Sequence, residues 1–297
     1  MCSVCVTLTG DTTALREALS RVQAELQAMR RDRALEPVVD ELTGTFVRHF
    51  DAEYTVLTRE LRSSRSGLFL ATEAKRATDR EHDRRIQRFL AALAAAQAAR
   101  ASSVVQRIER ELARAIRVGR LQAAQRLHVS VSFTTPQTRA VAWMKQHAAE
   151  LIKGIDETTR KRVASIVTQA VEEGWSYAKT EQVLKELYDG FRKSVPQKHL
   201  LSRARLIAVH EAAMAYTQGE LELGRWLAEG GLAVEKSWLT VMDERTCEVC
   251  SGNEGEGWIP LEQSFADGSE GTPGHVACRC HTDLRVAENP LAKAPAA

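Results

Sequence analysis

The stretch from Leu68 to Leu127 contains no proline. Alanine, leucine, arginine and glutamate dominate it, and these residues have high helix propensities. Apolar residues recur within it at intervals of three and four, which places them on one helix face: Val105, Ile108, Leu112 and Ile116. With only 5% aromatic residues, the whole chain favours helices over sheets. This pattern predicts a long amphipathic helix.

The residues before this stretch carry two further helical patterns. The first has the four–three spacing of the seam of a packed or coiled helix: Leu15, Leu19, Val22, Leu26 and Met29. The second follows Pro37 and indicates a separate helix: Val39, Leu42, Phe46 and Phe50. We therefore predict that residues 1–128 form an arginine-rich region of long helices.

A row of arginines lies opposite the apolar face of the long helix: Arg107, Arg110, Arg114 and Arg117. Basic residues exceed acidic ones in this region, and Lys75 is its only lysine. Two interpretations of the row stay open. It is either a solvated face, which Glu109 and Glu111 interrupt, or a surface for double-stranded DNA or an acidic protein.

Residues 129–232 are predicted to contain several further helices. We expect Gly154 to end the first of them and Asp156 to cap the second. Ser176 is a candidate N-cap for the third, and the last is expected to begin near Leu201.

The sequence pattern changes from helical to extended after the last predicted helix. The segment AVEKSWLTV alternates, which predicts a β-strand. The glycine-rich segment that follows has few large residues, so it can bury little apolar area and needs a cross-link. We predict a small α+β module at residues 233–285 and a flexible tail at 286–297.

Five metal-ligating side chains are concentrated in that module. Cys247 and Cys250 form a Cys-x-x-Cys pair, and His275, Cys278 and Cys280 follow. Thiolate and imidazole donors at this spacing are typical of tetrahedral structural zinc sites. The predicted fold is therefore mainly α, with a zinc-stapled α+β module. Which four of the five donors bind the ion stays open.

The sequence lacks the usual features of export and membrane insertion. No apolar run approaches the ~20 residues that span a bilayer, and the N-terminus does not read as a signal peptide. We therefore expect reduced thiols, which favours metal binding over disulfides. Cys2 and Cys5 form another Cys-x-x-Cys pair, but nothing nearby completes a shell, and we interpret them as a coincidence.

Motifs of catalysis are absent from the sequence. It contains no glycine-rich phosphate loop, nucleophile elbow or paired-histidine zinc helix. His-Asn-His nucleases also place their core beside cysteine pairs, but between Cys250 and His275 there is no histidine and only Asn253 as asparagine. A closed zinc shell would leave no position for a reactive water. The residues therefore favour a binding protein over an enzyme.

Three runs together resemble the phage Mu protein F-like family of minor head, or head morphogenesis, proteins: SRARLIAVHEAAMAYTQGELELGR, KSWLTVMDERTCEVCSGNEGEGWIPLEQSF and PGHVACRC. The matching residues outside the five donors are Glu211, Trp238, Asp243, Arg245 and Arg279. Val209-His210 stands where Arg-Thr is usual, and Val276 stands where a proline follows the histidine. The resemblance covers about residues 130–285.

The resemblance implies a structural virion protein of the head, assembled in the cytoplasm of a bacterial host. It also implies association with the portal and other head proteins, and a part in DNA packaging or delivery. Glu211, Trp238, Asp243 and Arg245 are motif residues without an assigned role. No toxin cargo is expected after Cys280. The alternative is a phage-derived nuclease or transferase that uses the metal module.

Overall fold

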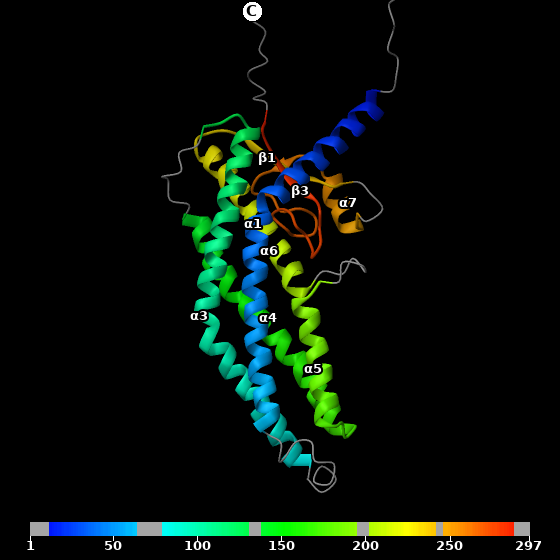
Figure 1. The fold of residues 1–297 in the computed structure, drawn as a ribbon. Helices are drawn as coiled ribbons and strands as arrows, with labels where there is room; N and C mark the ends of the chain where they lie inside the picture. The colour runs from blue at the N-terminus through cyan, green and yellow to red at the C-terminus, as the bar shows by residue number, and fades with distance from the viewer. Residues whose placement is uncertain (1–11, 64–78, 131–137, 195–201, 242–245, 288–297) are drawn as a thin grey trace, which may run out of the picture. The chain divides into compact units, whose positions relative to one another are not determined.

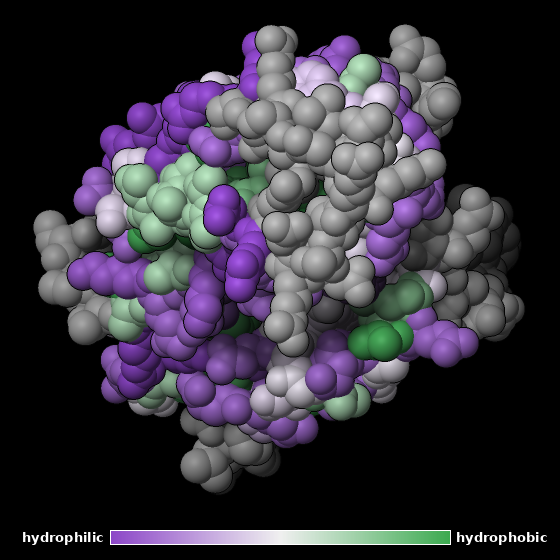
Figure 2. Space-filling model, turned by 90° about the horizontal axis from the view of Figure 1, so that it is seen from below, coloured by the Kyte–Doolittle hydropathy of each residue, from purple (hydrophilic) through white to green (hydrophobic). Residues whose placement is uncertain are grey.

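The computed structural model describes residues 12–63, 79–130, 138–194, 202–241 and 246–287. As predicted, this part of the chain is mainly helical with one small sheet (Figure 1). Its helices are α1 (Thr12–Ser63), α3 (Asp79–Arg126), α4 (Thr138–Glu172), α5 (Tyr177–Arg192), α6 (Arg203–Glu229) and α7 (Glu248–Gly255). None of the helices in these ranges is long and apolar enough to cross a membrane. The face drawn in Figure 2 is mostly hydrophilic where it is not grey.

The contacts of the chain define two compact units. Unit 1 combines residues 1–36, 117–133 and 216–297, and unit 2 combines residues 37–116 and 134–215. Helices α1, α3 and α6 therefore contribute residues to both units. The sequence-based division at residues 128, 232 and 285 stays a prediction about domains.

Unit 2 is a helical assembly with an apolar core. The apolar residues that recur at helical spacing after Pro37 face this core, because Leu42, Phe46 and Phe50 are fully buried. The other helices of the unit add further buried residues: Ile108, Leu112, Val163, Val167, Leu184 and Tyr188. As predicted, α5 begins after Ser176, whose hydroxyl accepts a hydrogen bond from the Lys179 amide.

Two predicted helix breaks are wrong. Helix α1 continues through Pro37, although proline lacks the amide hydrogen and costs about 3 kcal/mol in a helix interior. The buried flanking residues Leu35 and Val38 offset this, since burying each side chain contributes roughly 2 kcal/mol. Helix α4 likewise continues through Gly154. Asp156 therefore lies inside α4 and caps no helix, and its carboxylate accepts a hydrogen bond from His49.

The apolar seam near the start of α1 is exposed at the four positions whose side chains the structure describes. Its described members are strongly exposed: Leu19 at 58%, Val22 at 53%, Leu26 at 47% and Met29 at 68%. The buried face of this part of α1 is instead Ala24, Ala28, Arg31 and Leu35. The described residues of the seam therefore do not contribute to the core of unit 1.

The sheet of unit 1 has the strand order β2-β1-β3 and is antiparallel throughout. Its strands are β1 (Val234–Leu239), β2 (Ile259–Pro260) and β3 (His281–Val286). Strand β1 is the alternating segment predicted from the sequence, and its Val234, Lys236 and Trp238 are buried. Strand β3, which was not predicted as a strand, lies within the predicted module except for Val286 and pairs along the whole of β1.

Candidate metal centre

The first cysteine pair lies at the start of α7. Cys247 is the N-cap residue of this helix, with an extended backbone, and its sulfur accepts the backbone N–H of Cys250 at 3.5 Å. The glycine-rich segment CSGNEG was not predicted to be helical, but it forms this short helix. The cap and the first turn together bring both sulfurs to one side, which explains the Cys-x-x-Cys spacing.

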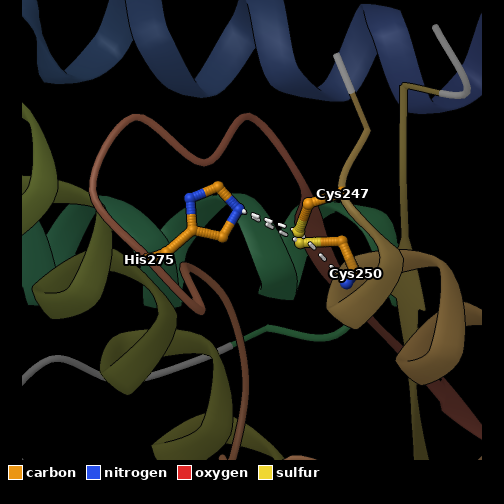
Figure 3. A group of neighbouring side chains, drawn as sticks. All are labelled: Cys247, Cys250 and His275. Atoms are coloured by element: carbon orange, nitrogen blue, oxygen red, sulfur yellow. Dashed lines mark hydrogen bonds between the residues drawn. The ribbon is translucent and has the colours of Figure 1, made fainter. Parts of the chain in front are cut away.

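His275 faces both of these sulfurs (Figure 3). Its Nε2 lies 3.3 Å from the Cys247 sulfur and 3.5 Å from the Cys250 sulfur. Its Nδ1 lies 2.9 Å from the carbonyl oxygen of Val276, which can only accept. The proton is therefore on Nδ1, and the Nε2 lone pair is available to a metal.

Cys278 and Cys280 extend the cluster on the buried side. The sulfurs of Cys250 and Cys278 are 3.8 Å apart. The sulfurs of Cys250, Cys278 and Cys280 all lie within 4.8 Å of one another. Cys250 therefore belongs to both groups of donors, one with His275 and one with the second cysteine pair.

Three of the donor spacings match those of a tetrahedral zinc site. With Zn–S bonds of about 2.3 Å and Zn–N bonds of about 2.0 Å, two sulfurs on one zinc are separated by about 3.8 Å and a sulfur and a nitrogen by about 3.5 Å. The 3.8 Å between Cys250 and Cys278 and the 3.3–3.5 Å from His275 to the first pair match these values. All five side chains predicted as donors lie in this one cluster.

The surroundings shift the pKa values of the four cysteine thiols in different directions. A hydrogen bond from Cys280 lowers the pKa of Cys278 to about 5, and the same bond raises that of Cys280. The backbone N–H of Cys250 lowers the pKa of Cys247. Burial raises the pKa of Cys250 to about 12. The site thus stabilises thiolates, the ligand form of cysteine, at Cys247 and Cys278.

Trp238 packs against the buried side of the cysteine cluster. It is fully buried, meets Phe265 edge to face at 5.2 Å between ring centres, and packs with Cys250, Cys278 and Cys280. Thr240, two residues later, donates its amide and hydroxyl hydrogens to Glu254 of α7. The motif tryptophan therefore belongs to the structural support of the cluster.

Among the described residues, Glu211 belongs to none of the candidate metal-binding groups. Glu211 lies in unit 2, where it accepts a hydrogen bond from His147. Asp243, Arg245, Cys2 and Cys5 lie outside the described residues. The four arginines of the row on α3 are all exposed, and Arg114 pairs with Glu111 at 2.7 Å.

Sequence reasoning missed a buried polar cluster in unit 2. His49 contacts Asp156 at 2.7 Å and Glu53 at 3.5 Å. Gln97 and Tyr188 donate hydrogen bonds to the Glu53 carboxylate, and burial raises its pKa. The sequence feature that could have indicated this cluster is the presence of the polar residues His49 and Glu53 on the otherwise apolar face of α1. Because its carboxylates accept hydrogen bonds from neighbouring side chains, we interpret the cluster as an internal hydrogen-bond network.

Comparison with known proteins identifies one region of the chain. Residues 161–283 match the family model described as "Phage Mu protein F like protein". The match runs from α4 into β3 and includes all five cysteine and histidine donors. No curated protein and no solved structure matches the chain significantly. The match confirms the resemblance predicted from the sequence, over residues 161–283.

Proposed function

We propose that this chain is a structural component of a phage head and acts in head morphogenesis by binding other head proteins. The observation that carries the proposal is the family match over residues 161–283, which spans the metal cluster and its supporting strands. The proposed location is the virion head, and the proposed site of assembly is the cytoplasm of the bacterial host. The portal is the proposed principal partner.

The cysteine and histidine cluster is proposed to hold one structural zinc ion. The proposed donors are Cys247, Cys250, His275 and Cys278, since Cys250 is shared between the group that holds Cys247 and His275 and the group that holds Cys278. Cys280 is proposed to donate a hydrogen bond to the Cys278 sulfur instead of binding the ion. The zinc would join the start of α7 to the segment before β3, and so stabilise a module with little apolar core.

Single substitutions test this ligand set. Zinc content of purified Cys278→Ser protein is expected to fall to near zero, whereas Cys280→Ser protein is expected to retain about one zinc ion per chain. Both side chains are buried, so the two variants create similar packing defects. If Cys278→Ser protein retains zinc and Cys280→Ser protein loses it, then Cys280 binds the ion and Cys278 does not.

The proposed action is binding, not catalysis. With four protein donors the shell is closed, which leaves no position for a metal-activated water. A nuclease assay with zinc-loaded full-length protein on single- and double-stranded DNA tests the enzyme alternative. Cleavage that disappears in Cys250→Ser protein would support an enzyme and contradict the binding proposal.

The location and the partners are tested with intact particles. The expected result is that mass spectrometry of purified phage heads detects this chain, and that chemical cross-linking joins it to the portal or to another head protein. Heads assembled without this chain should be fewer or defective. Purified heads that lack the chain, while assembling normally in its absence, would overturn the proposal.

A further inference from the structure

We infer that the first part of α1 forms a parallel, in-register coiled coil with a second copy of this chain. The exposed apolar seam of α1 consists of Leu19, Val22, Leu26 and Met29. These residues recur at intervals of three and four, the spacing of positions a and d of a coiled-coil heptad. Leu19 and Leu26 take position a, and Val22 and Met29 take position d.

The neighbouring positions are accessible as a coiled coil requires. At positions e and g, which flank the seam, Gln23, Arg30, Glu25 and Asp32 are all exposed. At positions c and f, on the opposite side of the helix, Ala24, Ala28, Arg31 and Leu35 are all buried. The helix thus packs on its own chain with one face and presents a complete coiled-coil face with the other.

The charged residues beside the seam favour a second copy of this chain as the partner, with the two helices parallel. In a parallel dimer, a residue at g lies beside the residue at e five positions later in the other helix. Glu25 would therefore face Arg30 of the second copy, and the pair would occur twice by symmetry. In the antiparallel alignment of the same seam, Glu25 would face Glu25 of the second copy, which repels.

Because α1 is already folded and packed on its own chain, association costs less conformational entropy than it would for an isolated helix. Short isolated helices are marginal in water, and two heptads alone would rarely dimerise. Here the seam belongs to a helix of 52 residues whose other face is already packed. The helix is therefore formed before association. With four apolar residues per copy, we expect a dissociation constant on the order of micromolar.

Sedimentation equilibrium of the full-length protein tests the inference. The wild type is expected to be a dimer at tens of micromolar, and Leu26→Lys is expected to weaken dimerisation at least about 100-fold, since both copies lose an apolar residue and gain a facing charge. Helix content should be unchanged, because Leu26 is exposed in the single chain. The matched control is Leu121→Lys, the same change at an exposed leucine of α3, which should leave the dimer intact.

Charge exchange tests the direction of the two helices. Glu25→Arg and Arg30→Glu should each weaken self-association, because each places like charges side by side in the parallel pair. An equimolar mixture of the two variants should form a heterodimer, because opposite charges then face each other. A monomeric wild type at 100 micromolar, or a Leu26→Lys protein that dimerises like the wild type, would overturn the inference. A partner other than a second copy would give the first of these results.

Discussion

Arg31 donates a hydrogen bond from its Nη1 to the carbonyl oxygen of Cys280 at 2.6 Å, across 249 residues of sequence. Arg31 lies on the buried face of α1 and is only 4% exposed. Cys280 immediately precedes β3, which forms one edge of the sheet. Within unit 1, an N-terminal helix is therefore joined by a buried, charged hydrogen bond to the segment that carries the cysteine cluster.

Replacing Arg31 with alanine is expected to lower the free energy of unfolding by about 2–3 kcal/mol, because a buried carbonyl loses its charged donor. Chemical denaturation measures the change. The control is Arg33→Ala on an exposed position of the same helix, with an expected effect within about 0.5 kcal/mol. Equal effects of the two substitutions would show that the bond to Cys280 contributes little.

Two glycines within helices should respond oppositely to alanine. A Cβ atom on Gly119 of α3 would lie 1.9 Å from the carbonyl oxygen of Tyr216 on α6, so Gly119→Ala is expected to destabilise by at least about 2 kcal/mol. A Cβ atom on Gly154 of α4 would meet no atom within 4 Å, so Gly154→Ala should stabilise by about 1 kcal/mol. Thermal unfolding of both variants checks the prediction. A stabilised Gly119→Ala protein would contradict the close approach of α3 and α6.

Glu220 should make stability depend on pH. Burial raises its pKa from 4.5 to about 7, against the attraction of Arg126. Between these two values the folded chain holds more protons at Glu220 than the unfolded chain does, so its contribution to stability falls as pH rises. The free energy of unfolding of the wild type, minus that of Glu220→Gln, is expected to decrease by up to about 3 kcal/mol between pH 4.5 and 7.5. Groups common to both proteins cancel in this difference. A difference independent of pH would contradict the raised pKa.

The arginine row on α3 distinguishes DNA contact from a solvated face. If the row binds phosphates, wild-type protein should bind duplex DNA without sequence preference and more weakly at higher salt. Changing Arg107, Arg110, Arg114 and Arg117 to glutamine should reduce the slope of log affinity against log salt by up to about four units. Titration of labelled duplex at several salt concentrations measures the slope. No binding by the wild type at low salt, or an unchanged slope in the variant, would identify the row as a solvated face.

The helices could be predicted because their apolar residues recur regularly along the sequence. The breaks expected at Pro37 and Gly154 were wrong because they rested on local propensity alone, whereas buried neighbours such as Leu35 and Ile155 hold the helices together. Strand β3 was missed for a related reason. Its His281 and Thr282 are polar and yet buried, so the sequence shows no alternation of apolar and polar residues there.

Within the site, the five donors could be predicted because their identity and spacing are local features of the sequence. The hydrogen bond from Arg31 could not, since nothing in the residues around position 31 indicates contact with Cys280. The exposed seam of α1 illustrates another limit. Its heptad spacing predicts a helical partner, but spacing alone does not indicate whether that partner lies in the same chain or in another.

Elemental analysis of the folded, freshly reduced full-length protein tests the structural zinc most directly. We predict about one zinc ion per chain, and removal of the ion by a chelator should expose residues 246–287 to limited proteolysis before the helices of unit 2 unfold. Structural zinc of this kind contributes roughly 10–16 kcal/mol of binding free energy, so its loss should release the module. A folded protein without zinc, whose proteolytic pattern is unchanged by the chelator, would contradict a structural zinc site.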